Sequence, residues 1–205
     1  MLIGLTGGIA SGKNLAANYF KELGAYIIDA DEISREITMP QMPAYNDIVN
    51  EFGLNILNPD KTINRKKLGE IVFNNKDLLK KLNQITHPKI IAEEKKRIKD
   101  IQSKKPDAVI VINAALLIES GHYKEMDKVI VVYADEDMQI KRIMQRDGLT
   151  EKEAKIRIAC QMPLKEKTKL ADFVIDNTQD IEKTRAEAAR IFEKMLQNSK
   201  LKTQN

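Results

Sequence analysis

The chain has 205 residues, a formal net charge of +4 and a single cysteine, which excludes a disulfide framework or cysteine-based metal cluster and suits a reducing, cytoplasmic environment. Its 34 basic and 30 acidic residues are mixed along the chain and only 5% of residues are aromatic, so we expect no nucleic-acid partner. No segment approaches the roughly 18 apolar residues of a membrane helix, so we expect neither a membrane anchor nor a targeting segment.

Five short β-branched runs, separated by charged segments with helical spacing, predict the core of the fold. This alternation is typical of an α/β protein with a parallel sheet covered by helices on both faces. Ligands of such a sheet bind beyond the carboxyl ends of its strands, so we expect functional residues directly after the strands. The runs are residues 2–6, 25–29, 108–113, 128–134 and 172–176.

Two excursions with helical patterns interrupt the alternation, and we expect both to belong to a single domain, residues 1–205. Residues 32–106 contain no convincing buried strand, which predicts a helical insertion. Residues 141–170 are highly charged, and a turn at Asp147 and Gly148 separates two predicted helices. The polar end, residues 198–205, is expected to fray. The predicted core is then made of residues 1–31, 107–140 and 171–200.

The first predicted strand runs into a glycine-rich loop, "GGIASGKNL", and then into a helix. Gly7, Gly12 and Lys13 fit the phosphate-binding pattern G-x-x-x-x-G-K-[ST], and a flanking strand and helix are the context that this pattern requires. Backbone N–H groups, the positive end of the helix and the lysine surround the phosphates in such loops. The predicted nucleotide-binding residues are Gly8, Ile9, Ala10, Ser11, Gly12, Lys13, Asn14 and Leu15.

Asn14 departs from this pattern, because other loops of this kind place a Ser or Thr hydroxyl there as a ligand of Mg²⁺. An asparagine carbonyl oxygen is also a hard ligand, so we predict that Asn14 is a weakened metal ligand. Asn113 ends the third strand, where many such proteins keep a metal-orienting aspartate. A chain that binds nucleotide but has lost catalysis therefore stays an alternative.

Two carboxylates follow the second predicted strand. Asp29 with Glu32 fits a helix-capping pattern, and this structural interpretation competes with a contact to substrate. Asp31 is the sharper candidate for catalysis. Transfer of a phosphoryl group to an alcohol needs a carboxylate that orients the hydroxyl and accepts its proton.

The chain resembles the dephospho-CoA kinase family in six segments that keep the order and approximate spacings of that family over nearly the whole length. The resemblance implies a P-loop kinase fold similar to nucleoside monophosphate kinases, with residues 32–106 as the acceptor-substrate insertion and 141–170 as a lid. It implies transfer of the γ-phosphate of ATP, with Mg²⁺, to the 3′-hydroxyl of the ribose of dephospho-CoA, the last step of coenzyme A synthesis. The segments are "GLTGGIASGK", "DADEISREI", "THPKI", "ALLIESGHY", "KVIVVYADEDMQIKRIMQRDGLT" and "QMPLKEKTKLADFVIDN".

Two other functions are alternatives to it, one a related kinase activity and the other a nucleotide-dependent switch. Another nucleotide or nucleoside kinase would share the loop and the lid, although the "HP" and "LLIE" segments argue against it. A guanine-nucleotide switch is disfavoured, because the chain contains no D-x-x-G element.

The resemblance also implies roles for individual residues in catalysis. Asp31 is the expected base and Lys13, Arg142 and Arg146 the other catalytic residues, with the arginines closing over the phosphates. Arginines four apart share a helix face and can equally form a solvated stripe. Arg157, on the second predicted helix of the lid, is a further candidate beside them.

On the acceptor side the resemblance implies contacts from the "HP" and "LLIE" segments. His87 precedes Pro88, a good first residue of a helix, so a place at a helix entrance is the alternative. Ala115 stands where the family usually has a proline. Asn177 is expected at the adenine edge, or else as a turn former. The predicted acceptor residues are Asp29, His87, Leu116, Leu117 and Glu119, of which the leucines can also be core and Glu119 a solvated charge.

Overall fold

The computed structural model describes residues 1–202, with side chains as far as residue 197. Part of the segment that we expected to fray, residues 203–205, lies outside this described range. The chain divides into two compact units, one formed by Met1–Ile28 with Asp100–Asn205 and the other by Asp29–Lys99.

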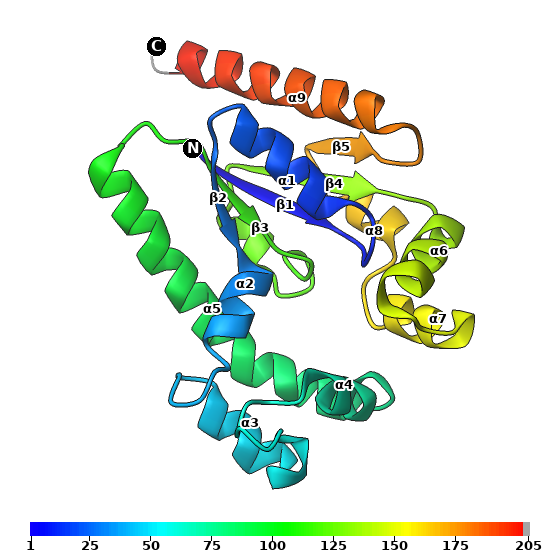
Figure 1. Cartoon of the computed structure of the whole chain (residues 1–205). Coiled ribbons are helices and arrows are strands. Elements are labelled where there is room, and N and C mark those ends of the chain that lie inside the picture. Colours follow the sequence, from blue (N-terminus) through cyan, green and yellow to red (C-terminus); the bar gives the residue numbers. More distant parts are fainter. Residues whose placement is uncertain (203–205) are drawn as a thin grey trace. The chain divides into compact units, whose positions relative to one another are not determined.

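The first unit is built on the predicted five-stranded parallel sheet, with the strand order β2-β3-β1-β4-β5 (Figure 1). The central strand β1 pairs in parallel with β3 on one side and β4 on the other. The loop that follows β1 therefore leaves from the middle of the carboxyl edge of the sheet. The strands are β1 (Leu2–Gly7), β2 (Tyr26–Asp29), β3 (Ile110–Asn113), β4 (Lys128–Tyr133) and β5 (Phe173–Asp176).

Helices cover both faces of the sheet, as predicted, because successive strand side chains point to opposite sides. On one face, Ile130 and Val132 of β4 join a buried core with α1 (Lys13–Glu22) and α9 (Ile181–Lys202). On the other face, Val131 packs with Leu164 of α8 (Leu164–Thr168). The sheet is thus apolar on both sides, which leaves its carboxyl edge for polar residues.

The predicted lid segment is a helix pair, α6 (Glu136–Asp147) and α7 (Glu151–Ala159). Gly148 ends α6 with a left-handed backbone, φ 66°, as the predicted turn requires. The apolar side chains between the two helices also contact Ile9 and Ala10. The helix pair therefore packs against the loop after β1.

The second unit is helical apart from an isolated bridge between Leu57 and Ile63, in agreement with the predicted helical insertion. A short 3-10 turn, η2 (His122–Glu125), belongs to the first unit and precedes β4. The second unit contains α2 (Ala30–Glu36), α3 (Tyr45–Phe52), the 3-10 turn η1 (Leu54–Ile56), α4 (Arg65–Phe73) and most of α5 (Lys76–Lys104).

His87 and Pro88 lie inside α5, which corrects the interpretation that they mark a helix entrance. The helix begins earlier because the Asn75 side chain accepts hydrogen bonds from the backbone N–H groups of Asp77 at 3.0 Å and Leu78 at 3.2 Å. An asparagine cap of this kind stabilises a helix start, whereas Pro88 lies in the helix interior, where proline lacks an N–H donor and its ring crowds the carbonyl four residues earlier.

Candidate functional site

The loop between β1 and α1 is curled by two residues with left-handed backbones, Ala10 at φ 58° and Gly12 at φ 96°. Gly12 must be glycine, because a Cβ at that position would lie 2.0 Å from Asn177 Nδ2. Ala10 adopts this region with a side chain, which costs about 1–2 kcal/mol. The Ser11 hydroxyl is buried and has no hydrogen-bond partner among the described residues. The loop is therefore strained and specialised, as expected of a phosphate-binding turn.

Two glutamines hold Ile9 through both of its backbone groups. Gln161 Oε1 accepts from Ile9 N at 2.8 Å, and Gln139 Nε2 donates to Ile9 O at 2.6 Å. Gln139 lies on α6 and Gln161 shortly after α7, so the predicted lid segment is tied to the loop at its base. The sequence did not single out either glutamine. In the structure, a Cβ on Gly8 would lie 2.4 Å from Gln139 Nε2, so the glycine at this position makes room for Gln139.

Arg142 and Asn177 brace the other half of the loop. The Arg142 guanidinium donates to Ala10 O and Asn177 O, each at 3.2 Å. Asn177 Nδ2 donates to Ser11 O at 2.7 Å, and Asn177 Oδ1 accepts from Thr184 Oγ1 at 3.0 Å. Arg142 is therefore no part of a solvated stripe, and the buried Asn177 does more than form a turn. Their contacts with ATP remain predictions.

Arg146 is held by the neighbouring carboxylate. Its Nε and Nη2 donate to the two oxygens of Asp147 at 2.8 Å and 2.9 Å, and Arg157 Nη1 lies 3.6 Å from Asp147 Oδ2. The hydrogen bond from Arg146, followed by the charges of both arginines, holds the pKa of Asp147 below its usual range. Both predicted lid arginines of α6 are therefore paired within the lid or with the loop.

Lys13 lies between two asparagines. Its Nζ donates to Asn113 Oδ1 at 2.8 Å and to Asn14 Oδ1 at 3.3 Å, and Asn113 Nδ2 donates to Asn14 Oδ1 at 3.1 Å. Both amide oxygens already accept hydrogen bonds and neither residue carries a charge, so as arranged this donor set does not fit a protein-held Mg²⁺. In the part of the chain that the structure describes, no group of three or more His, Cys, Asp or Glu residues could hold a metal ion.

Lys167 was not singled out by the sequence, yet its side chain is completely buried beneath the loop. Its Nζ donates to Ala115 O at 2.7 Å and Gly7 O at 3.5 Å, and lies 2.8 Å from Glu119 Oε1. Burial lowers the pKa of Lys167, an effect that Glu119 opposes. Glu119 Oε1 also accepts from Met162 N at 3.0 Å. Glu119 is therefore the partner of a buried cation and not a solvated helix charge.

The leucines of the "LLIE" segment differ in position. Leu117 is 1% exposed, and a Cβ on Gly4 would lie 2.4 Å from Leu117 Cδ2. Leu117 is therefore a core residue, and its predicted contact with an acceptor is not supported. Leu116 is only partly buried, so its contact remains a prediction.

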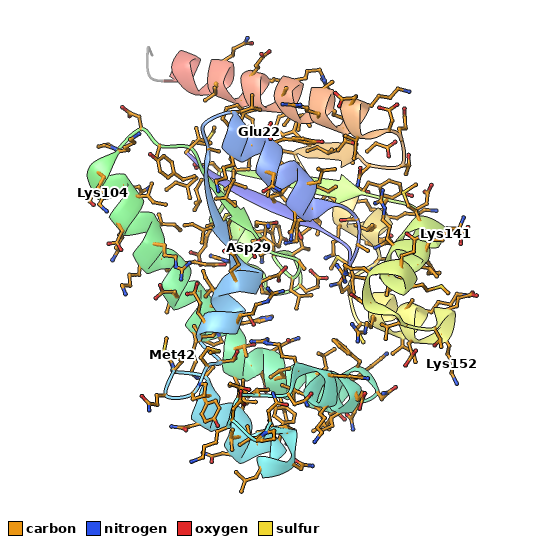
Figure 2. The ribbon with its side chains drawn as sticks, in the orientation of Figure 1. Glu22, Asp29, Met42, Lys104, Lys141 and Lys152 are labelled. Atoms are coloured by element: carbon orange, nitrogen blue, oxygen red, sulfur yellow. The ribbon has the colours of Figure 1, made fainter. Side chains whose placement is uncertain are left out.

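Asp29 ends β2 and caps α2 (Figure 2), and Asp31 lies in the first turn of that helix. Asp29 Oδ1 accepts hydrogen bonds from the backbone N–H groups of Asp31 at 2.8 Å and Glu32 at 3.1 Å. The capping interpretation of Asp29 is confirmed. Asp31 is exposed in the first helical turn, a position compatible with its predicted role as base.

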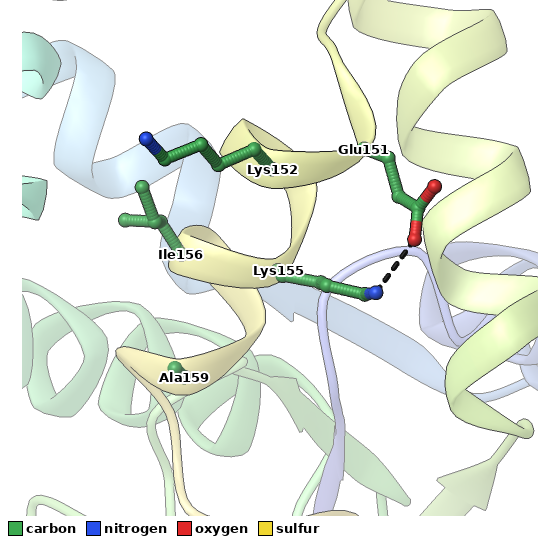
Figure 3. A pocket seen from close by; sticks show the side chains of 5 residues that line it. All are labelled: Glu151, Lys152, Lys155, Ile156 and Ala159. Carbon is green, nitrogen blue, oxygen red and sulfur yellow. Dashed lines mark hydrogen bonds and ion pairs between the residues drawn. The ribbon is translucent and has the colours of Figure 1, made fainter.

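A surface pocket lies on α7 and is separate from the loop (Figure 3). One helix supplies its whole lining, and its polar pair, Glu151 and Lys155, is joined by an ion pair of 2.6 Å. It therefore lacks the convergence of groups from several elements that marks the loop. In the described part of the chain, no helix is long and apolar enough to cross a membrane.

Comparisons with known proteins agree with this arrangement. Residues 1–183 match the family model of dephospho-CoA kinase. A dephospho-CoA kinase of Carboxydothermus hydrogenoformans is 49% identical over 193 residues, which cover 94% of this chain and 93% of that protein.

Two solved structures share the fold. A dephospho-CoA kinase from Campylobacter jejuni is 34% identical, with a TM-score of 0.60, and covers 94% of this chain and 96% of its own. A shikimate kinase from Acinetobacter baumannii, 16% identical with a TM-score of 0.54 over 96% of this chain and 93% of its own, supports the fold alone. On its sequence match and its phosphate-binding loop, the chain belongs to the dephospho-CoA kinase family.

Proposed function

We propose that this chain transfers the γ-phosphate of ATP to the 3′-hydroxyl of the ribose of dephospho-CoA, giving coenzyme A and ADP. The observation that carries the proposal is the strand, loop and helix around Lys13, in a chain that matches the dephospho-CoA kinase family over residues 1–183. We place the reaction in the cytoplasm.

The loop and Lys13 bind the β- and γ-phosphates in this proposal. Backbone N–H groups of residues 8–14 surround the phosphates, and the N-terminus of α1 adds its partial positive charge. Lys13 keeps its hydrogen bonds to Asn113 and Asn14 and also donates to phosphate oxygen, since an ammonium group carries three donors. Mg²⁺ bound with ATP would neutralise part of the phosphate charge.

The two arginines of α6 stabilise the charge of the transferred group. Arg142 already lies against the loop, through Ala10 O. Arg146 can leave Asp147 and turn toward the phosphates, since its side chain is 60% exposed. Closure of α6 and α7 excludes water that would otherwise hydrolyse ATP.

Asp31 acts on the acceptor. Its carboxylate orients the ribose hydroxyl and accepts the proton that is lost when the oxygen–phosphorus bond forms. His87, Leu116 and Glu119 are the proposed acceptor contacts, and Asp29 supports Asp31 by capping α2.

The test is an assay of ADP release with ATP, Mg²⁺ and dephospho-CoA, compared with AMP and adenosine as acceptors and with a blank that lacks acceptor. Turnover confined to dephospho-CoA is the expected result. Turnover with AMP or adenosine would favour another nucleotide or nucleoside kinase. ATP binding without turnover on any acceptor would favour an impaired relative, which the Asn14 and Asn113 pair makes a specific alternative.

A further inference from the structure

Lys13, Asn14 and Asn113 form a closed hydrogen-bonded triangle, which we call the Lys13 triangle. An ammonium group only donates, so the Asn113 oxygen faces Lys13 and its NH₂ group faces the oxygen of Asn14. Lys13 is 7% exposed and Asn113 1%, whereas Asn14 is exposed. Two corners of the triangle are therefore shielded from solvent and the third faces it.

The two asparagines occupy positions from which phosphate-binding loops supply a metal-ligating hydroxyl and a metal-orienting carboxylate. Here the Asn113 NH₂ group points at Asn14 Oδ1 from 3.1 Å, so partial positive charge faces a cation that approaches this oxygen. Asn14 Oδ1 also accepts from Lys13. A metal ligated by Asn14 would have to displace one of these two donors.

We propose that Asn14 and Asn113 are a matched pair that replaces protein coordination of Mg²⁺ by hydrogen bonds within the Lys13 triangle. The inference rests on the proposed binding of ATP by this loop. The protein then binds the nucleotide phosphates through Lys13 and the loop amides and adds no metal ligand of its own. The affinity of the protein for the nucleotide is therefore nearly the same with and without Mg²⁺.

The pairing predicts that the two positions act together. Asn14→Ser alone removes the acceptor that Asn113 Nδ2 uses. Asn113→Asp alone places a carboxylate beside Lys13 and turns an acceptor toward the acceptor of Asn14. Only the double variant Asn14→Ser, Asn113→Asp combines a hydroxyl and a carboxylate, so the effects of the single changes should not be additive.

The experiment measures the dissociation constant of a fluorescent, non-hydrolysable ATP analogue in excess Mg²⁺ and in EDTA. For the unchanged chain and both single variants we expect Mg²⁺ to tighten binding by less than about threefold. For the double variant we expect at least about tenfold, because outer-shell groups that orient a metal ligand are commonly worth about 10–100-fold in metal affinity. Asn18→Ser, an exposed position on α1 outside the triangle, is the matched control, and thermal unfolding checks the fold of each variant.

Two results would overturn the inference. One is a tenfold gain with Mg²⁺ in the unchanged chain that Asn14→Ala abolishes. The other is a correctly folded double variant that gains no more than the single variants. Both are independent of phosphate transfer, so a chain that fails to phosphorylate dephospho-CoA but shows the expected binding would refute the proposed function alone.

Discussion

The buried cation Lys167 allows a quantitative test of how the loop is supported. Lys167→Met keeps the length of the side chain and removes the positive charge, leaving the carboxylate of Glu119 without its partner. Removing one member of a buried ion pair costs about 3–5 kcal/mol. Glu119 keeps a hydrogen bond from Met162 N and its side chain is 21% exposed, and Ala115 O keeps a hydrogen bond from Thr6 Oγ1. We therefore expect the lower value, about 3 kcal/mol.

The assay is denaturant and thermal unfolding of the variant and the unchanged chain. A loss of about 3 kcal/mol corresponds to a fall in Tm of roughly 6–12 °C for a chain of this size. Lys169→Met is the control, since Lys169 is 68% exposed, and it should change the free energy of unfolding by less than about 0.5 kcal/mol. A Lys167→Met variant that unfolds within about 0.5 kcal/mol of the unchanged chain would refute the reasoning.

The pH dependence adds a second readout. Burial lowers the pKa of Lys167 from the ordinary value of 10.5, so between the lowered pKa and 10.5 the unfolded chain binds more protons than the folded one. The contribution of Lys167 to the free energy of unfolding therefore rises with pH across this interval. The Lys167→Met variant should lack this rise. Parallel pH profiles of the free energy of unfolding for the variant and the unchanged chain would contradict this prediction. Glu119→Gln should widen the interval, because the charge that supports the protonated lysine is lost.

Three further predictions concern other parts of the candidate site. Asp31→Asn should cut the turnover of dephospho-CoA at least a hundredfold, in line with general base catalysis, with ATP affinity unchanged; its helix neighbour Glu32→Gln should change neither, and an equal loss of ATP affinity would make Asp31 structural. Ala10→Gly should stabilise the chain by about 0.5–1 kcal/mol in denaturant unfolding, since relief of strain exceeds the added entropy of the unfolded chain; destabilisation would argue against strain at this residue. The hydrogen bond from Arg146 holds the pKa of Asp147 below its ordinary value of 3.8. The stability that this carboxylate contributes above pH 3.8 is therefore lost as the pH falls through the lower pKa of the folded chain. Asp147→Asn should make the free energy of unfolding depend less on pH in that range.

Local patterns in the sequence determined the elements of the sheet and the loop. β-branched runs predict buried parallel strands because both faces of such strands pack against helices, and all five runs became strands. The loop was recognisable because its glycines, Lys13 and the flanking elements lie within one short segment. The capping role of Asp29 was also visible, since a helix cap involves neighbours in sequence.

Tertiary structure decided the residues that support the loop. The contact of Gln161 with Ile9 joins residues 152 apart, and that of Lys167 with Gly7 joins residues 160 apart. Such contacts leave no period or spacing in the sequence. A lysine among charged residues looks solvated, and whether it can be buried depends on the partners that the fold brings to it. For the same reason the amides of Asn14 and Asn113 look like two separate losses of metal ligands in the sequence, and only their 3.1 Å contact makes them a pair.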